Sequence, residues 1–331
     1  MGVRVIKAGI LDTVQDAGRY GYQHLGINPC GAMDEVAMSV ANMLAGNNRN
    51  EAVIELHYPA SSFLFGEDCV IALSGADFCA TINDELAPIN TSLLVSKHST
   101  LQFTHFKNGE RCYLAVHGGW DVEEWLNSCS THLKAAVGGY NGRSLKKDDM
   151  LIVHSLRSFF PKLGAQSFVA TDIRANVSEL YNSNNSIRCI RGSEYCMLSN
   201  DAKKKFETLP FKISVHSDRM GYGLSGENLS FDDERLLSSA VTKGTVQLLP
   251  SGQMIILMAD HQTTGGYPKI AHVISADTPT LAQKKPNEAI HFQFVTVKEA
   301  EDLYMRQQQY FQQLEDEISL QLKQFFNNGN Y

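Results

Sequence analysis

The sequence of 331 residues lacks the short motifs of several large enzyme classes. It has no GxxxxGK[ST] segment and no GxSxG segment, so neither a Walker-type nucleotide loop nor a serine-hydrolase elbow is indicated. Its seven cysteines form no CxxC pair, and its eleven histidines form no HxH or HExxH pair. These absences argue against a structural zinc site, and we expect no bound metal.

Long apolar runs and concentrated positive charge are also missing. No run approaches the ~20 apolar residues that a membrane helix requires. The net charge of −7 argues against a nucleic-acid partner. The densest basic run, Lys203–Lys205, is expected to be a solvated helix face. An odd number of cysteines without pair motifs fits a reducing compartment, so we expect a cytoplasmic protein with free thiols.

Short apolar runs bounded by Gly, Asn, Asp or Pro dominate the chain and predict β-strands. A polar linker-type stretch, Tyr181–Ser186, separates two strand-rich halves, which favours two β-barrels with few helices. The predicted strands include Cys69–Leu73, Ser92–Val95, Cys112–Val116, Met150–Val153, Ile187–Ile190, Ile213–Val215, Thr245–Leu249, Met254–Met258 and Ile290–Val295.

The sequence predicts helices in four segments. Met33–Leu44 has an apolar stripe at helical spacing, with Asp34 and Glu35 at its start. Further helices are predicted at Val122–Ser128, Ser199–Leu209 and Val297–Phe326. We therefore expect a mainly β protein with domains at 1–182 and 187–297 and a C-terminal helix at 298–326. That helix packs on its own domain or contacts a partner chain.

The segment Thr13–Asp34, TVQDAGRYGYQHLGINPCGAMD, is dense in glycine and polar side chains. Glycine-rich loops allow sharp turns and close approach to a ligand. Asp16 and Arg19 either pair with each other or bind a ligand, with Arg19 as an anion clamp. The candidate substrate-binding residues here are Asp16, Arg19, Gln23 and His24.

Three further segments carry weaker signals. In LSGADF, Asp77 is either a turn cap or a catalytic carboxylate. In SDRMGY, Arg219 is either salt-bridged in a strand connector or directed into a cleft. Two loops with exposed amides and hydroxyls are plain turns or candidate phosphate-binding sites, with residues Gly118, Gly119, Ser130 and Thr131.

The segment Asp260–Lys269, DHQTTGGYPK, is the strongest candidate for chemistry. A structural turn needs only its glycines and proline, whereas a polar small-molecule pocket needs its surplus of hydrogen-bonding groups. We predict Asp260 as a general base and Lys269 as a group that stabilises an oxyanion. The other predicted substrate-binding residues are Gln262, Thr263, Thr264, Gly265, Gly266 and Tyr267.

Together, TVQDAGRYGYQHLGINPCGAMD, AVHGGWD, STHLKAAVGGYNGR, SDRMGYGLSG and MADHQTTGGYPKIAHVISAD resemble the KipA family. It is also called allophanate hydrolase subunit 2, or carboxyltransferase subdomain C/D. The resemblance covers about Val3 to Val297. It implies two tandem cyclophilin-like β-barrel domains. The chain departs from the family's pattern at Cys129, Ser239 and His261.

The resemblance also implies a function. Stand-alone bacterial members are similar to the C subunit of ATP-dependent 5-oxoprolinase, which opens 5-oxo-L-proline to L-glutamate. They work with two partners, a KipI-like protein and a LamB/YcsF-like protein, so ATP with Mg²⁺ is expected in the complex and no tightly bound cofactor here. The alternatives are a carboxyltransferase subunit of urea or related amide metabolism and a non-catalytic partner of a KipI-like protein. No Met-Lys dipeptide occurs, so biotin is not expected on this chain.

Overall fold

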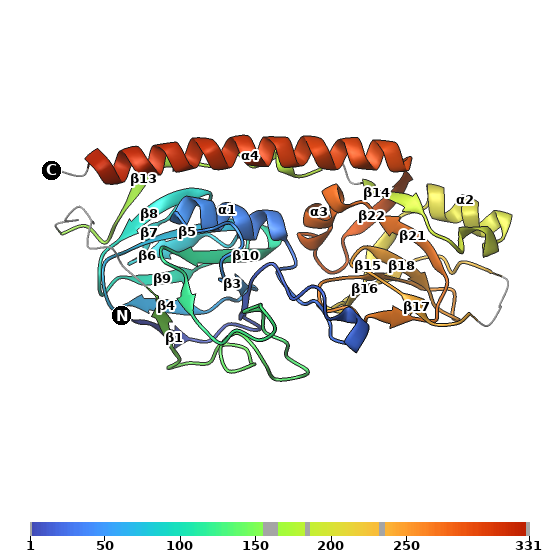
Figure 1. Ribbon diagram of the computed structural model, residues 1–331, viewed down its shortest axis with the longest axis horizontal. Helices are drawn as coiled ribbons and strands as arrows, with labels where there is room; N and C mark the ends of the chain where they lie inside the picture. Colours follow the sequence, from blue (N-terminus) through green and yellow to red (C-terminus); the bar gives the residue numbers. More distant parts are fainter. Residues whose placement is uncertain (1, 155–164, 183–185, 232–235, 329–331) are drawn as a thin grey trace. The chain divides into compact units, whose positions relative to one another are not determined.

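The computed structural model describes residues 2–154, 165–182, 186–231 and 236–328, with side chains to residue 326. The chain divides into two compact units, which we describe separately. Unit 1 comprises Met1–Gly18, Asp34–Val177 and Phe311–Tyr331, and unit 2 comprises Arg19–Met33 and Ser178–Tyr310. The described residues form many strands and few α-helices, which confirms the mainly β class (Figure 1).

Unit 1 is built from two antiparallel sheets. The first has the order β11-β12-β1-β4-β9-β6-β7 and the second the order β13-β8-β5-β10-β3-β2. Their bounds are β1 Gly2–Lys7, β2 Thr13–Gln15, β3 Val53–Leu56, β4 Ser62–Phe65, β5 Cys69–Asp77, β6 Ala80–Ile82, β7 Glu85–Leu86, β8 Thr91–Val95, β9 Thr100–Phe103, β10 Asn108–Val116, β11 Trp120–Asp121, β12 Met150–Val153 and β13 Phe168–Arg174.

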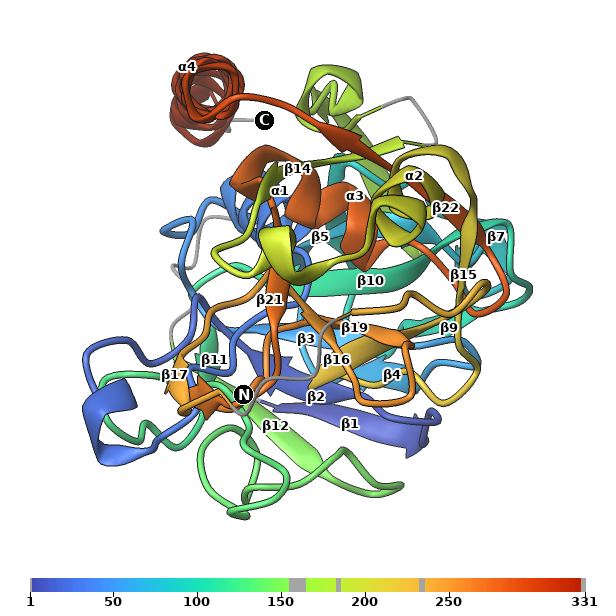
Figure 2. The ribbon, with the colours of Figure 1, turned by 90° about the vertical axis from the view of Figure 1, so that its right-hand side faces the viewer.

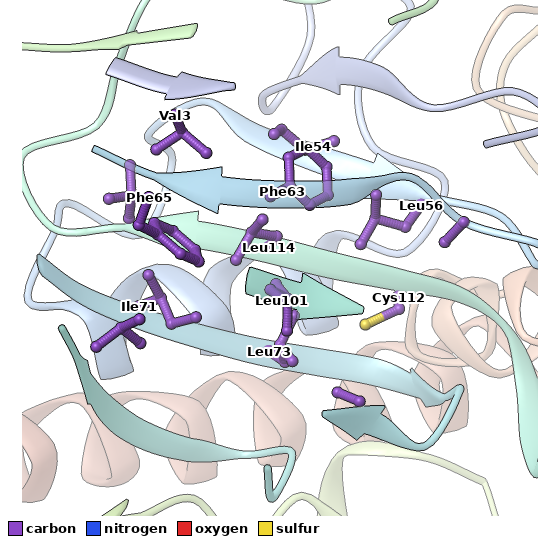
Figure 3. Close-up of a cluster of buried hydrophobic side chains, with 14 of the residues drawn as sticks. Val3, Ile54, Leu56, Phe63, Phe65, Ile71, Leu73, Leu101, Cys112 and Leu114 are labelled. Atoms are coloured by element: carbon purple, nitrogen blue, oxygen red, sulfur yellow. The ribbon is translucent and has the colours of Figure 1, made fainter. Parts of the chain in front are cut away.

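The core of unit 1 is formed by alternate residues of these strands. Phe63 and Phe65 of β4 and Ile71 and Leu73 of β5 are fully buried in one cluster, which Figure 3 shows with Leu114 of β10. Because side chains alternate across a strand, the intervening residues of β5 face the other way. Helix α1, Glu35–Ala45, packs against β5 and β10, so β5 is buried on both faces. This explains its continuous apolar run.

Helix α1, Glu35–Ala45, confirms the predicted helix at Met33–Leu44. The Asp34 carboxylate accepts a hydrogen bond from the Ala37 amide at 2.9 Å, which satisfies an amide that has no partner inside the helix. Gly46 ends the helix with a positive φ of 74°, a conformation that glycine adopts at little cost. Sequence-local signals therefore set both ends of this helix.

Unit 2 contains a closed barrel of seven strands, in the order β14-β21-β18-β19-β16-β15-β22, which Figure 2 shows from one side. The pair β14 and β22 is parallel, and the other pairs are antiparallel. The bounds are β14 Ser186–Arg191, β15 Phe211–Ile213, β16 Gly221–Ser225, β18 Thr245–Leu248, β19 Met254–Leu257, β21 Lys269–Val273 and β22 Ala289–Phe294. A separate two-stranded antiparallel sheet is formed by β17 Ser239–Ala240 and β20 Thr264–Gly265.

The remaining helices of the described residues are α2 Asn200–Thr208, α3 Thr278–Ala282 and α4 Val297–Asn328, with short 3-10 turns at η1 Gln23–Leu25, η2 Ser178–Leu180, η3 Tyr195–Met197 and η4 Ser275–Asp277. Helix α2 confirms the predicted helix at Ser199–Leu209, and its Phe206 stacks on Phe292 of β22 with ring centroids 4.5 Å apart. In the described parts of the chain, no helix is both long and apolar enough to cross a membrane.

The structure differs from the sequence-based predictions in one helix and in how the chain is divided. The predicted helix at Val122–Ser128 is wrong, because Leu126 and Asn127 have positive φ angles of 53° and 59° and interrupt any helix there. The compact units are also drawn differently from the predicted domains, since Arg19–Met33 belongs to unit 2 and α4 contributes residues to both units.

Candidate functional site

Arg219 and Asp260 form a buried ion pair in unit 2. Asp260 follows β19 and Arg219 precedes β16, and these antiparallel neighbours bring the two residues to one end of the barrel. Arg219 Nε and Nη2 donate to the two Asp260 carboxylate oxygens at 3.0 and 2.9 Å. The side chains are 4% and 15% exposed. A bidentate pair at this exposure holds both groups in a fixed orientation.

The glycine-rich segment Arg19–Met33 lies against this ion pair. Asn28 Nδ2 donates to the Asp260 carbonyl oxygen at 2.8 Å, and Arg219 Nη2 donates to the Gly31 carbonyl at 2.6 Å. Arg19, only 1% exposed, donates its backbone amide to Pro29 at 2.8 Å. Unit 2 therefore connects two predicted site residues, Arg219 and Asp260, to the segment that contains a third, Arg19.

The pKa of the Cys30 thiol depends on the charges of this cluster. Burial and, to a smaller extent, the Asp260 carboxylate raise the pKa of its thiol to about 12. The charges of Arg19 and Arg219 act in the opposite direction. The thiol stays protonated at pH 7, in a cluster that contains the Arg219–Asp260 ion pair. An environment with this balance suits a ligand anion such as a carboxylate.

His261 is a buried, neutral imidazole beside Asp260. Burial lowers its pKa and Lys243 lowers it further, against the opposing effects of the Gln262 hydrogen bond and Asp260. Its Nδ1 lies 2.6 Å from the Gln262 carbonyl oxygen, which only accepts, so Nδ1 carries the proton and Nε2 is the acceptor atom. Lys243 Nζ donates to the Ala32 carbonyl at 3.3 Å.

Lys269 lies in a second polar cluster of unit 2. Its Nζ donates to Ser239 Oγ at 2.7 Å and lies 3.2 Å from Glu194 Oε2. Burial opposes ionisation of Glu194, yet hydrogen bonds from Ser193 and Lys269 lower its pKa overall. The ammonium charge of Lys269 is therefore already balanced by a carboxylate within this unit.

The remaining predicted residues of DHQTTGGYPK connect to neighbouring strands. Gln262 Nε2 donates to Gln247 Oε1 at 3.2 Å, and the Thr263 carbonyl accepts from the Val241 amide at 3.2 Å. A Cβ at Gly265 would lie 2.3 Å from Gln247 Nε2, so a side chain there would displace the Gln247 amide. Thr264, Gly266 and Tyr267 are exposed, as is His24, whereas Gln23 is half-buried and accepts from the Gly21 amide at 2.8 Å.

The other predicted residues belong to unit 1, where Asp16 organises a loop. Its carboxylate accepts hydrogen bonds from Ser128 Oγ at 2.7 Å, Ser130 Oγ at 2.5 Å and the Cys129 amide at 2.6 Å. Thr131 Oγ1 donates to the Val14 carbonyl at 2.9 Å. Both hydroxyls predicted for phosphate binding are thus buried and donate within unit 1.

Asp77 and the glycine pair have similar local roles. Asp77 accepts from the Cys79 amide at 2.9 Å and pairs with Lys107 at 2.8 Å. Gly118 and Gly119 both have positive φ, and their amides donate to the Asn47 side chain at 2.9 Å and the Val116 carbonyl at 3.0 Å. Each of these donors already has an acceptor inside the unit.

Sequence reasoning missed four members of the unit 2 clusters: Asn28, Lys243, Glu194 and Gln247. It gave Cys30 no role in the site, because the position of this residue near Asp260 depends on a contact between distant segments. The only local signal was the run of polar residues and glycine around Asn28 and Cys30.

Residues 25–294 match the family described as "Carboxyltransferase domain, subdomain A and B". The chain belongs to this family. The description names subdomains A and B, where the resemblance suggested the C/D label. Within the carboxyltransferase family, the chain is 38% identical to the C subunit of 5-oxoprolinase from Escherichia coli, over 94% of this chain and 97% of that protein. It is 36% identical to the C subunit of 5-oxoprolinase from Haemophilus influenzae, over 91% and 94% respectively.

Solved structures of carboxyltransferase relatives share the fold. The K. lactis urea amidolyase superposes with a TM-score of 0.84 at 26% identity, covering 95% of this chain and 20% of that protein. This chain therefore spans about a fifth of that much longer protein. The comparison extends over both units and confirms the fold predicted from the resemblance.

Proposed function

We propose that this chain is the C subunit of an ATP-dependent 5-oxoprolinase, which opens 5-oxo-L-proline to L-glutamate. The observation that carries the proposal is the 38% identity to the Escherichia coli protein over 97% of that protein's length. By comparison, this chain is 28% identical to the urea amidolyase of Lachancea kluyveri and covers only 18% of that protein. Agreement in both identity and length favours the 5-oxoprolinase assignment.

The Arg219–Asp260 cluster supports a substrate of this kind. 5-Oxoproline carries one carboxylate on a lactam ring, and a carboxylate is bound well by guanidinium groups. We propose that Arg19 and Arg219 bind that carboxylate and that Asp260 orients Arg219. Asp260 remains our proposed general base for the attacking water, a role that requires one of its two oxygens to leave Arg219 in the complex. His261 Nε2 is a second acceptor atom beside it.

The phosphate-binding predictions fit less well. The hydroxyls of Ser130 and Thr131 donate to Asp16 and Val14, and the amides of Gly118 and Gly119 donate inside unit 1. A nucleotide phosphate at either loop would have to displace these bonds. We therefore propose that a partner protein, and not these residues, binds ATP and Mg²⁺.

The proposed partners are a KipI-like protein and a LamB/YcsF-like protein, in a cytoplasmic complex. Lys269 and Asp77, predicted as catalytic, are each paired with an opposite charge, Glu194 and Lys107. We propose that Lys269 stabilises the oxyanion only if substrate or a partner changes its contact with Glu194. Asp77 is the weaker of the two proposed catalytic residues, because its carboxylate already caps the turn at Cys79.

The test is reconstitution of this chain with the KipI-like and LamB/YcsF-like partners, with glutamate and phosphate release as readouts. We expect activity from the complex, and a loss of at least ~100-fold in Asp260→Asn, the order expected when a positioned catalytic group is removed. Asp201→Asn, an exposed carboxylate of the same unit, is the matched control. An active complex that Asp260→Asn leaves unaffected would refute the site but keep the function.

A second candidate is half of a biotin-dependent carboxyltransferase, favoured by the family description and by the fold of the urea amidolyase. It predicts carboxyl transfer from a carboxybiotin carried on another chain. A third candidate, a regulatory partner of a KipI-like protein, predicts tight binding without turnover. Failure of glutamate release, together with carboxyl transfer or with binding alone, would replace the first proposal by one of these.

A further inference from the structure

Cys79 and His105 form a separate nucleophile–base pair in unit 1. Cys79 lies in the turn between β5 and β6, and His105 follows β9. Strands β6 and β9 are paired, with Ala80 opposite Phe103, so the residues just beyond them meet at one edge. The Cys79 Sγ and His105 Nε2 atoms are 3.0 Å apart. This separation lies within the contact range of activated nucleophiles and their bases.

The hydrogen bonds around His105 define which nitrogen faces the sulfur as an acceptor. The Thr104 hydroxyl donates its proton to the Cys79 carbonyl oxygen at 3.0 Å. His105 Nδ1 lies 3.1 Å from the same hydroxyl oxygen, which can only accept from it. Nδ1 therefore carries the ring proton, and Nε2 presents its lone pair to the thiol. In cysteine and serine enzymes, the nucleophile is activated by a base whose tautomer is fixed by a third group. Here these are Cys79, His105 and Thr104.

The two charged residues near the Cys79 sulfur, Asp77 and Lys107, pair with each other. His105 is therefore the group that can take the proton of the Cys79 thiol. Asp77 accepts from the Cys79 amide and is paired with Lys107 at 2.8 Å. The hydrogen bond that Lys107 donates to Asp77 is the main reason that the pKa of Lys107 is raised, and Cys79 adds to it. One carboxylate and one ammonium thus balance each other, and the imidazole of His105 is the group in contact with Sγ.

The other cysteines provide internal comparisons. Burial raises the pKa of the Cys69, Cys112 and Cys189 thiols, which predicts inert side chains. Cys196 is exposed, and its Sγ contacts only the Ser193 carbonyl among the described residues, at 4.0 Å. Cys79 is 9% exposed, and its partner His105 is exposed, so the pair borders on solvent through the histidine.

We propose that Cys79 is a reactive thiol, deprotonated by His105, and a modification site for small electrophiles and peroxides. With iodoacetamide, an S–C bond forms as the C–I bond breaks, iodide leaves and His105 Nε2 receives the thiol proton. With hydrogen peroxide, an S–O bond forms as the O–O bond breaks. The sulfur loses two electrons and becomes a sulfenic acid, and the leaving hydroxide takes the proton from His105 to give water.

The test is the rate of iodoacetamide labelling at each cysteine of the folded chain, followed by peptide mass spectrometry from pH 6 to pH 8. An ordinary thiol with a pKa of ~8.5 loses roughly tenfold in rate per pH unit in this range. We expect Cys196 to behave so, and Cys79 to change less than about threefold and to react at least about fivefold faster at pH 7. A dimedone-trapped sulfenic acid at Cys79 after peroxide treatment is expected as well.

His105→Gln, which cannot accept the proton, should lower the Cys79 rate to that of Cys196 or below, and Thr104→Val should lower it less. The inference fails if Cys79 in the unaltered protein labels no faster than Cys196, or follows the same pH dependence. That comparison needs no substitution, so it stands even if a variant does not fold.

Discussion

The Arg219–Asp260 ion pair illustrates how much a single buried contact in unit 2 contributes. Removing one partner leaves the other charge buried, which typically costs ~3–5 kcal/mol. Arg219 also donates to the Gly31 carbonyl, so its loss releases the glycine-rich segment at the same time. The pair therefore supports both stability and the shape of the proposed site.

We expect Arg219→Met to lower the free energy of unfolding by about 3 kcal/mol. Arg191→Met is the matched control, because Arg191 of the same barrel is 65% exposed and lies 4.0 Å from Glu207. Its replacement should cost less than about 1 kcal/mol. Urea denaturation of both variants measures the difference, and equal costs would contradict the buried role of Arg219.

Asp12 makes the stability of unit 1 depend on pH. Burial raises its pKa from 3.8 to about 6, despite hydrogen bonds from Ser61 and His57. Between these values the folded protein binds more protons than the unfolded chain. Its contribution is therefore fully present below pH 3.8 and is lost as the pH rises through about 6. Two pKa units correspond to roughly 3 kcal/mol.

Asp12→Asn should flatten this dependence, because the amide does not ionise. We expect a smaller fall in the free energy of unfolding between pH 4 and pH 7 than in the unaltered protein. Asp148→Asn, at a carboxylate that is 56% exposed, should leave the slope unchanged. Urea titrations across this pH range give the slopes, and parallel slopes for the protein and Asp12→Asn would show the assignment to be wrong.

Among the elements, helix α4 was predictable because its signal is local. Its buried residues, Phe311, Leu314, Ile318 and Leu322, recur at intervals of three or four. That period is present in the sequence whatever the helix packs on. The same holds for α1, whose cap Asp34 and stop Gly46 are adjacent to it.

Ile318→Ala should destabilise the protein by about 2–4 kcal/mol, because it opens a cavity under a residue that is 1% exposed. Leu320→Ala, on the same helix and 58% exposed, should cost less than about 0.5 kcal/mol. Thermal unfolding of both variants is the measurement. If the two costs are alike, the buried stripe of α4 is misassigned.

Elements and residues fixed by distant contacts were not predictable in the same way. The propensities of Val122–Ser128 favour a helix, yet Glu123 forms a bridge with Gly139, and two residues adopt positive φ. The site shows the same limit. DHQTTGGYPK identified Asp260, but Lys269, nine positions later, pairs with Glu194 of a different cluster. Sequence proximity therefore grouped residues that unit 2 places in two separate clusters.

At the scale of the whole molecule, the proposed site predicts which substrates the assembled complex accepts. Pyrrolidin-2-one has the lactam ring of 5-oxoproline without its carboxylate. If Arg19 and Arg219 bind that carboxylate, pyrrolidin-2-one should show at least ~100-fold lower kcat/KM, the value of a lost charged contact of ~3 kcal/mol. In Arg19→Met the two substrates should become closer in kcat/KM. An undiminished preference in that variant would remove Arg19 from the site.

The attachment of Asn28 to Asp260 joins positions 232 apart in the sequence. At roughly 5–20 residues per second, a ribosome needs about 10–50 seconds to pass from one to the other. During that interval the segment Arg19–Met33 has emerged but the barrel that buries it has not. Maturation of the site is therefore a late event in biosynthesis, and a chain stalled before residue 260 presents Arg19 and Cys30 to solvent and to the proteins that survey nascent chains.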